Sequence, residues 1–434
     1  MHTKLLIKIR RKSQPGWLIW FITIMPFLFG TLNDFIGLPY GIRYLLDLAW
    51  ASLMVYLVRY YYAGNGRNTK VIILGISIFF VYAALIYLVE YQSILYFVWG
   101  SRNNLRFYVV FLAVAAFISI KDIERYLAIF DKLFWVNIVV SLVQFFVWGY
   151  NQDHLGGIFG IEKGCNAYNN IFFCLVLTKS IVFYLQKKEK TWVCVLKCAA
   201  ALLVAALAEL KFFFVEFVII AVLAVLFTDF TWRKLLVVVG GAVLVSLGSF
   251  LLAMVFPSFA GFLSIDVLWD MATSDKGYTS SGDLNRLNAI PQINKLWLKN
   301  WSQRLFGLGL GNCETSSMTF LNTPFYQEHG WRHYTWLSYA FMYLECGWIG
   351  LIFYFGFFGW VFLKARKIAL YMTGMEKSYC LLTAIISICC MITAIYNSSL
   401  RTEAGYMAYF ILAIPFVLER NYSRENMQYK KESV

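Results

Sequence analysis

Residues 70–90 read KVIILGISIFFVYAALIYLVE, and no charged residue lies between Lys70 and Glu90. A transmembrane α-helix needs about 20 consecutive, mostly apolar residues, because the hydrocarbon core of a bilayer is about 30 Å thick. This stretch is therefore long enough and apolar enough to cross a membrane as one helix. Its apolar residues run continuously instead of alternating, which excludes a strand of a transmembrane β-barrel.

The composition of the whole chain agrees with this stretch. Of the 434 residues, 60% are hydrophobic and only 14% are charged, with a mean hydropathy of +0.63. An ordinary soluble domain has about a quarter of its residues charged. The composition excludes a soluble enzyme, a DNA-binding domain, a coiled coil and a disordered chain. It predicts an all-α protein, folded as a polytopic bundle of transmembrane helices.

Eleven further apolar runs bring the number of predicted spans to twelve. The spans are expected near residues 16–32, 41–62, 70–90, 104–120, 127–148, 167–186, 191–209, 211–228, 233–256, 334–362, 378–397 and 403–419. The chain then divides into nine helices over 1–256, a large extracytoplasmic loop with short helices over 257–333, three helices over 334–419 and a basic tail over 420–434. The first run lacks a small-residue cleavage site, so we expect it to be retained.

The distribution of basic residues predicts the orientation in the membrane. The formal net charge is +14, and most of the 38 lysines and arginines fall in the N-terminal segment, in alternate loops and in the tail. Cytoplasmic loops of membrane proteins carry such an excess of Lys and Arg. Both termini are therefore expected in the cytoplasm, and the charge requires no nucleic acid as a partner.

The loop over 257–333 is more polar than its neighbours but contains four tryptophans. Within it, apolar side chains recur at helical spacing at Leu287, Ile290, Ile293, Trp297 and Trp301. This pattern predicts one amphipathic helix that lies on the membrane surface or caps the bundle. A shorter outer connection, residues 90–106, is interpreted as a re-entrant segment.

Basic residues at the outer ends of the spans are not explained by the orientation rule. They are Arg43, Arg102, Arg106, Lys211, Arg286, Arg332 and Arg401. Ionisable groups at this depth are costly and usually mark functional sites. The alternative is that each pairs with a nearby carboxylate: Lys211 with Glu209, Arg401 with Glu403 and Arg332 with Glu328, whereas Arg102 and Arg106 have only Glu90 close in sequence. A cluster of guanidinium groups suits an anionic ligand, and phosphate above all.

Histidine and cysteine residues complete the candidate chemistry. His154, His329 and His333 fall in outer loops, and His333 directly precedes the tenth span, where its imidazole could transfer a proton. No CxxC pair has metal spacing, so neither a structural zinc nor any other metal is expected. Cys165 and Cys313 both fall in outer loops, which leaves a disulfide between them open.

Several local motifs occur in an order that is typical of one family. They are GGIFG at 156–160 followed by Asn166, SSGDLNRLNAIP at 280–291 with its Arg286, LFGLGLGN at 305–312, and HYTWL at 333–337 followed by ECGWIGL at 345–351. With the many spans and one large late outer loop, they resemble the O-antigen polymerase and O-antigen ligase superfamily (Wzy-type and WaaL-type). These are bacterial membrane glycosyltransferases. Tyr334 and Lys211 depart from the family pattern, which often has Asn and a Ser-Arg pair there.

The resemblance implies a location in the bacterial cytoplasmic membrane and a mechanism. The donor would be an oligosaccharide on undecaprenyl pyrophosphate, and a sugar hydroxyl would attack its anomeric carbon on the outer face. His333 would act as general base or position the acceptor, and Arg286 would be the principal catalytic arginine. Lys211, Arg102, Arg106, Arg401 and Arg332 would bind the pyrophosphate. No metal or other cofactor is implied, and a chain-length regulator and a flippase are the implied protein partners.

Three functions remain open at this point. Polymerisation of the repeat units of a capsule, exopolysaccharide or O-antigen is the first expectation. Ligation of a finished glycan to lipid A-core or to a protein uses the same chemistry with another acceptor. A flippase or transporter of lipid-linked sugars would also use arginines. A transporter needs a site that opens to both faces, and the chain shows no internal repeat.

Overall fold

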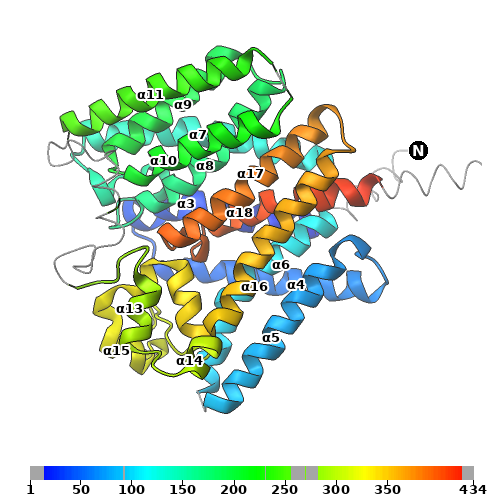
Figure 1. The fold of residues 1–434 in the computed structure, drawn as a ribbon, viewed down its shortest axis with the longest axis vertical. Coiled ribbons are helices and arrows are strands. Elements are labelled where there is room, and N and C mark those ends of the chain that lie inside the picture. Colours follow the sequence, from blue (N-terminus) through cyan, green and yellow to red (C-terminus); the bar gives the residue numbers. More distant parts are fainter. Residues whose placement is uncertain (1–13, 91–92, 230, 256–268, 270–281, 423–434) are drawn as a thin grey trace, which may run out of the picture.

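The computed structural model describes residues 14–90, 93–229, 231–255, 269 and 282–422. These residues form helices and connecting segments, without a strand among them. The long helices pack side by side, while the short helices α13, α14 and α15 gather at one end of the bundle (Figure 1). The all-α prediction is therefore confirmed.

The first half of the described chain contains ten helices that we refer to below. Their bounds are α2 Gln14–Ile24, α3 Pro26–Gly30, α4 Leu45–Tyr62, α5 Lys70–Glu90, α6 Ile94–Phe117, α7 Ile120–Phe146, α8 Asn166–Leu185, α9 Thr191–Leu207, α10 Lys211–Phe227 and α11 Arg233–Val255. The later helices are α13 Ala289–Leu296, α14 Trp301–Phe306, α15 Pro324–His329, α16 Ser338–Ala369, α17 Gly374–Tyr396 and α18 Gly405–Leu412.

Seven helices of the described chain are long and apolar enough to cross a membrane. They run over Tyr40–Tyr62, Arg67–Glu90, Ile120–Phe146, Asn166–Leu185, Arg233–Val255, Ser338–Ala369 and Gly374–Tyr396. The pair Gln14–Ile24 and Pro26–Phe35, bent by 45°, brings the number to eight if it forms one span. These helices are consistent with a multi-pass membrane protein. The remaining predicted spans also fall on helices, but twelve crossings stay a prediction.

Residues 94–106, which the sequence analysis interpreted as part of an outer connection, belong to a continuous helix. Helix α6 begins at Ile94 and continues without interruption to Phe117, so that Arg102 and Arg106 both lie on it. The two guanidinium groups are paired with Asp47 and Glu403. Ion pairing offsets part of the free-energy cost of burying basic side chains inside a bundle. The part of α6 that carries Arg102 and Arg106 can therefore remain helical.

The predicted surface helix over 287–301 is divided into two. Helix α13 ends at Leu296, and α14 begins at Trp301. Asn300 is the N-cap of α14 and shares a capping box with Gln303. Such a box satisfies the free N–H groups of a new helix, so it favours a fresh start at this point. Ile293 is buried against the bundle, whereas Leu287 and Trp301 are exposed.

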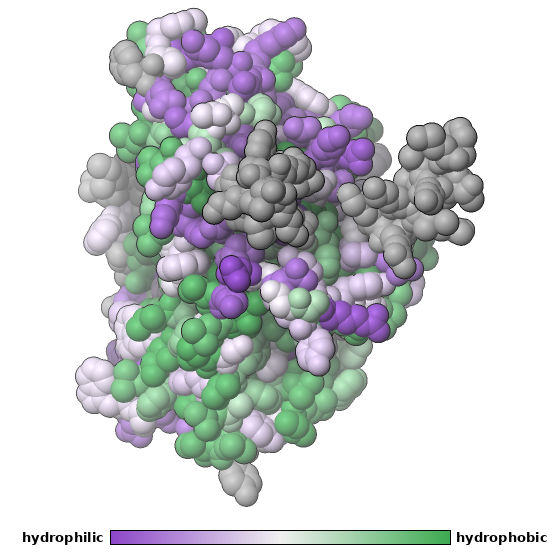
Figure 2. All heavy atoms as spheres, turned by 90° about the vertical axis from the view of Figure 1, so that its right-hand side faces the viewer, coloured by the Kyte–Doolittle hydropathy of each residue, from purple (hydrophilic) through white to green (hydrophobic). Residues whose placement is uncertain are grey.

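The interior of the bundle is formed around α8, α17 and α18. In the central part of α8, 94% of the residues are buried, compared with 6% in α11. Helices α5 and α11 therefore present apolar side chains outward, as expected where lipid replaces water. Figure 2 views the end of the molecule toward which the α4–α5 loop projects, and hydrophilic side chains gather over its upper part while apolar ones cover much of the lower part.

A break in α16 holds the glycine motif at 305–312 in place. Gly347 has a φ of +59° within α16. The freed carbonyl oxygens accept hydrogen bonds from the motif, Leu308 N–H to Leu344 O at 3.0 Å and Gly309 N–H to Glu345 O at 2.8 Å. A Cβ atom at Gly347 would lie 2.3 Å from the carbonyl oxygen of Leu305. The motif is thus a turn that packs closely against the broken part of α16.

Replacing Gly347 with alanine is expected to destabilise the protein by about 2–4 kcal/mol, because it adds a positive-φ penalty to a clash with backbone. The measurement is thermal unfolding of the detergent-solubilised protein. Gly359→Ala is the matched control, since Gly359 lies on the same helix with open space around its Cβ position. Equal unfolding temperatures for both variants would contradict the role of the break.

Candidate functional site

A polar cavity of about 610 Å³ lies at the end of the bundle that carries the predicted outer segments. Its walls come from the short helical turn Tyr40–Tyr44 that precedes α4, from the first half of α6 and from four connecting segments. The lining residues are Tyr40, Arg43, Tyr44, Trp99, Arg102, Asn103, Arg106, Glu162, Glu314, Thr315, Ser316, Ser317, Thr335, Trp336, Ser398, Arg401, Thr402 and Glu403. We call this space the arginine cavity. It brings together Arg102, Arg106 and Arg401, three of the residues predicted to bind pyrophosphate.

Arg102 is held by the first turn of α4. Its guanidinium contacts both carboxylate oxygens of Asp47, with Nη2 at 2.6 Å from Oδ2 and Nε at 3.0 Å from Oδ1. The guanidinium also lies 4.7 Å above the ring of Trp99. A fork bound on one edge and stacked on an aromatic face has a fixed orientation. The sequence analysis missed Asp47, whose carboxylate stands in an otherwise apolar run.

Arg106 and Glu403 form a second pair, deeper in the cavity wall. Arg106 Nη1 lies 3.4 Å from Glu403 Oε1, and Arg106 Nη2 donates to the carbonyl oxygen of Arg401 at 2.7 Å. The hydroxyl of Tyr168 donates to Glu403 Oε2 at 2.8 Å. Burial alone would raise the pKa of the Glu403 carboxyl, but Arg106, Arg43 and this hydroxyl outweigh it and hold the pKa below its ordinary value.

Arg401 pairs with Glu314 rather than with its sequence neighbour Glu403. Arg401 Nη2 lies 2.9 Å from Glu314 Oε1, and its guanidinium lies 3.3 Å from the ring centroid of Phe341. The predicted Arg401–Glu403 pair is therefore wrong. The reason is tertiary: the segment 311–317 folds into the cavity wall and presents a carboxylate from 87 residues away in sequence.

Arg43 differs from the other three arginines of the cavity. Its Nε donates to Asn33 Oδ1 at 3.4 Å, and its guanidinium lies 5.0 Å above the Tyr40 ring. Among the residues that the structure describes, no carboxylate forms an ion pair with it. The sequence analysis had counted Arg43 among the unexplained basic residues without assigning it to the site. Arg43 is the cavity arginine best able to meet an anionic ligand.

The charge of the arginine cavity is mixed. Four arginines and three glutamates line it, together with two tryptophans, Trp99 and Trp336. Glu162 stands at the rim, where it and Asp34 both lie within hydrogen-bond distance of the Tyr40 hydroxyl, which can donate its single hydrogen to either. Guanidinium groups can donate to phosphate oxygens or sugar hydroxyls, carboxylates can accept from hydroxyls, and aromatic faces add apolar contact. The cavity therefore fits a ligand that carries both anionic and hydroxyl groups.

His333 lies beside the arginine cavity without lining it. Its backbone is left-handed, with a φ of +53°, and its ring stacks on Trp336 with 3.9 Å between centroids and 8° between planes. Trp336 forms the cavity wall at this point. The neighbouring Tyr334 is turned inward, and its hydroxyl donates to the carbonyl oxygen of Cys313 at 2.8 Å.

Arg286 does not line the cavity but contacts the end of α17. Its guanidinium lies 4.1 Å from the ring centroid of Tyr396, and its Nε donates to the Tyr396 carbonyl oxygen at 3.1 Å. Ser398, two residues further on, belongs to the cavity wall. Arg332, which is also outside the wall, donates to the carbonyl oxygen of Gly282 at 3.1 Å.

Lys211 begins α10 and is also outside the cavity wall. Its ammonium group lies 2.9 Å from Glu209 Oε1, so the predicted pairing with Glu209 is confirmed. The next residue, Phe212, stacks on the Tyr396 ring with 4.0 Å between centroids and 8° between planes. Tyr396 thus joins the surroundings of Lys211 to those of Arg286, but neither basic group belongs to the set that lines the cavity.

The thiol groups do not form a metal site in the described part of the chain. No group of three His, Cys, Asp or Glu side chains there could hold a metal ion. The nine cysteines are free, so Cys165 and Cys313 form no disulfide. Burial, together with the negative charges of Asp34 and Asp153, raises the pKa of the Cys165 thiol to about 12, which keeps it unreactive.

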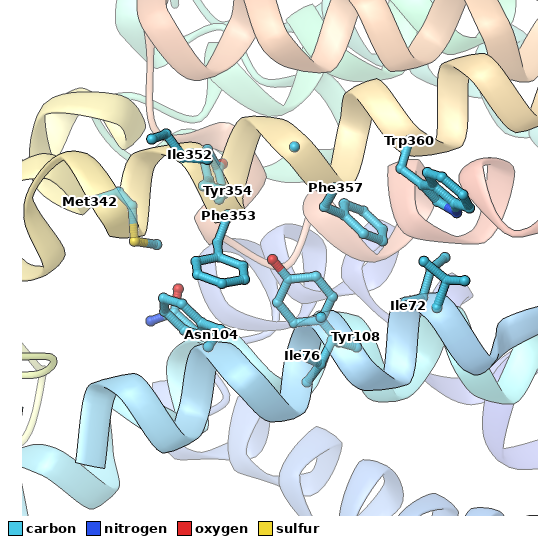
Figure 3. A pocket seen from close by; sticks show the side chains of 14 residues that line it. Ile72, Ile76, Asn104, Tyr108, Met342, Ile352, Phe353, Tyr354, Phe357 and Trp360 are labelled. Atoms are coloured by element: carbon cyan, nitrogen blue, oxygen red, sulfur yellow. The ribbon is translucent and has the colours of Figure 1, made fainter. Parts of the chain in front are cut away.

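An apolar groove of about 300 Å³ lies between α5, α6 and α16. Figure 3 shows the rings of Phe353, Phe357 and Trp360 on α16 facing Ile72 and Tyr108 across the groove. Other lining residues, Val71 and Ile352, are exposed on the outside of the bundle, so the groove opens toward the lipid side. We call it the α5–α16 groove.

Helix α6 contributes to both spaces. It supplies Arg102, Asn103 and Arg106 to the arginine cavity, and Asn104 and Tyr108 to the α5–α16 groove. Successive residues of a helix point about 100° apart, so one turn can face two different spaces. A polar site and an intramembrane apolar groove are therefore next to each other on one helix.

Comparison with protein-family models gives no match to the chain, and comparison with curated proteins gives none either. The function is therefore argued from the residues and geometry of the arginine cavity and the α5–α16 groove.

Proposed function

We propose that this chain is a membrane glycosyltransferase that polymerises surface polysaccharide, either capsule, exopolysaccharide or O-antigen. It would transfer an oligosaccharide from undecaprenyl pyrophosphate to a sugar hydroxyl on the outer face of the bacterial cytoplasmic membrane. The observation that carries the proposal is the shared turn of α6, which places an arginine-rich cavity beside a lipid-side apolar groove. A lipid-linked pyrophosphate has this same combination of an anionic head and a long hydrocarbon tail.

The arginines support the role of the pyrophosphate as leaving group. When the bond between the anomeric carbon and the pyrophosphate oxygen breaks, negative charge accumulates on the leaving oxygens. Of the four arginines that line the cavity, Arg43 is the one that forms no ion pair with a described carboxylate, and Arg102 and Arg401 border the same space. Preorganised donors aimed at developing charge are usually the largest single contribution to catalysis. Arg106 is committed to Glu403 and would act mainly by shaping the wall.

The α5–α16 groove supports the lipid part of the donor. Its wall is almost entirely apolar, and its opening lies where the hydrocarbon tails of the bilayer would be. Isoprenoid units nearest the pyrophosphate would pack against Phe353, Phe357 and Ile76. Moving a hydrocarbon chain from the lipid bilayer into an apolar groove gains little free energy. The groove would therefore mainly orient the donor rather than hold it tightly.

Replacing Gly356 with phenylalanine is expected to reduce polymer formation about tenfold by filling the groove, through loss of donor positioning. A Cβ atom at Gly356 meets open space, so the variant should fold normally. The measurement is the amount of long polysaccharide made by a deletion strain that carries the variant. Gly359→Phe is the matched control, because Gly359 lies on the same helix in open space but does not line the groove. Equal activity of the two variants would argue against a tail in this groove.

The acceptor would approach through the mouth of the arginine cavity. Trp336 offers an aromatic face there, stacked from behind by His333. The sequence resemblance gives His333 as general base or as acceptor-positioning group, and its place behind Trp336 favours the positioning role. Arg286 and Arg332 remain proposed contributors through the segments that border the cavity, since neither guanidinium lines it.

The deciding experiment uses a deletion strain complemented with the wild-type gene or with Arg286→Ala or His333→Ala. Undecaprenyl-linked glycans are extracted and sized beside the surface polysaccharide. Single repeat units accumulating on lipid, with loss of the long polymer, support the polymerase. Long lipid-linked chains that never reach a final acceptor indicate the ligase. Accumulation on the cytoplasmic leaflet alone indicates a flippase and contradicts the proposal.

A further inference from the structure

We propose that Glu314 is the catalytic base, and that it accepts the proton of the attacking sugar hydroxyl. This inference rests on the proposed glycosyl transfer and names a residue that neither the motifs nor the resemblance assigned. Two observations support it. Glu314 lines the arginine cavity, and only one of its carboxylate oxygens, Oε1, is bound by Arg401.

The side chain of Glu314 is firmly oriented. Its Oε1 accepts from Arg401 Nη2 at 2.9 Å, and its side chain is only 5% exposed. Its main chain is held as well, because Thr323 donates to the Glu314 carbonyl oxygen through both N–H and Oγ1, at 3.3 and 3.2 Å. Within the described residues, no hydrogen bond occupies Oε2. A carboxylate fixed in this way can offer one oxygen to a substrate hydroxyl.

A second carboxylate holds the peptide that precedes Glu314. Glu345 is 1% exposed, and its Oε1 accepts from the N–H of Cys313 at 3.0 Å. The carbonyl oxygen of Cys313 in turn accepts from Tyr334. Both sides of residue 313 are therefore anchored, so the direction of the Glu314 side chain is set by the packed loop rather than by solvent. Glu345 acts as a positioning residue for Glu314.

The other carboxylates of the cavity are less suited to this role. Glu403 uses both oxygens, accepting from Arg106 at Oε1 and from Tyr168 at Oε2. Glu162 is exposed at the rim, where water reaches it directly. His333 has its ring covered by Trp336 and is not part of the wall. Among the described groups that line the cavity, Glu314 is the enclosed carboxylate with an oxygen available.

The proton transfer balances with the proposed reaction. The acceptor oxygen forms a bond to the anomeric carbon of the donor sugar while the bond from that carbon to the pyrophosphate oxygen breaks. The electron pair of the broken bond leaves with undecaprenyl pyrophosphate. The hydroxyl proton moves to Glu314 Oε2 and is later released to water, which returns the carboxylate. Arg401 stays bound to Oε1 throughout and keeps the charged form in place.

The test compares Glu314→Gln, Glu314→Asp and the control Glu124→Gln, an exposed glutamate of α7 outside the cavity, in membranes of the deletion strain. The probe is the undecaprenyl-linked repeat unit extracted from that strain, and elongation is measured against pH. Glu314→Gln is expected to reduce the elongation rate by about 10²–10⁴-fold, the usual contribution of general base catalysis. The elongation rate of Glu314→Gln should no longer fall as the pH is lowered, because the group that is protonated there is gone. The undecaprenyl-linked donor should still accumulate in this variant. Glu314→Asp should recover part of the rate, and Glu124→Gln should stay near the wild-type rate.

The outcomes separate this inference from the proposed function. If wild-type membranes fail to elongate the repeat unit, the proposed function itself is wrong. If the wild type elongates the repeat unit, and Glu314→Gln elongates it at the same rate with the same decrease in rate at low pH (the acid limb of the pH profile), the assignment of Glu314 is overturned. If Glu314→Gln does not fold, as judged by thermal unfolding, the pH profile of Glu314→Asp decides. A shifted acid limb supports Glu314 as base, and an unchanged profile at full rate overturns it.

Discussion

Replacing Arg43 with alanine is expected to reduce polymer formation about 100-fold, the usual cost of removing one donor to developing negative charge. The folded protein should keep most of its stability, because within the described residues Arg43 forms no direct ion pair that the change would break. The change removes a long hydrogen bond to Asn33, a contact with the Tyr40 ring and one of the positive charges that act on Glu403. The main loss is therefore expected in activity. The measurement is the elongation rate in membranes, beside the thermal unfolding temperature of the purified protein.

The controls for Arg43 separate charge from geometry. Arg43→Lys keeps the positive charge but loses the fork, so partial activity is expected. Arg59→Ala removes an exposed arginine from the other end of α4 and should leave the rate unchanged. Full activity of Arg43→Ala would show that the cavity does not meet an anionic ligand at this position.

Replacing Arg106 with alanine is expected to destabilise the protein by about 3–5 kcal/mol, as is typical when one partner of a buried ion pair is removed. Its side chain is 6% exposed, and its loss leaves the Glu403 carboxylate without its guanidinium partner in the cavity wall. The carbonyl oxygen of Arg401 also loses its donor. The measurement is the free energy of unfolding in detergent.

The matched control for Arg106 is Arg125→Ala. Arg125 forms a pair with Asp122 in which its side chain is 77% exposed, and such surface pairs contribute little. The pH dependence gives a second readout. Because the pKa of Glu403 is lowered in the folded protein, wild type should lose this stability as the pH falls below the ordinary carboxyl range. Arg106→Ala should lose much of that dependence. Equal stability of Arg106→Ala and wild type would contradict a structural role.

The arginines of the site could be found from the sequence, but their partners could not. Arg102, Arg106 and Arg401 stood out because basic groups at the outer ends of apolar runs have no local explanation. Their carboxylates are Asp47, Glu403 and Glu314, and each is far away in sequence from the arginine it contacts. Only the Lys211–Glu209 pair, two residues apart, was predicted correctly. Local spacing identifies a costly charge, whereas the packing of distant segments decides what compensates it.

The glycine motif shows the same division. Its alternating glycines Gly307, Gly309 and Gly311 all have positive φ values, a conformation that glycine adopts readily and that a tight turn requires. The sequence did not show that this turn is fastened to the broken part of α16, nor that it carries Glu314 into the cavity wall. Glu314 itself was overlooked, although a lone carboxylate shortly after a glycine-rich turn was the signal available.

The sequence by itself predicted a helical chain with many apolar runs, and it placed most helices of the described residues to within a few residues. The physical reason is that a bilayer demands long apolar runs, which are a local property of the chain. The tertiary structure alone decided which basic groups share a cavity, which carboxylates neutralise them, and that α6 joins the cavity to an apolar groove. These facts depend on contacts between segments far apart in sequence, and a charged side chain settles where a partner lowers the cost of its burial.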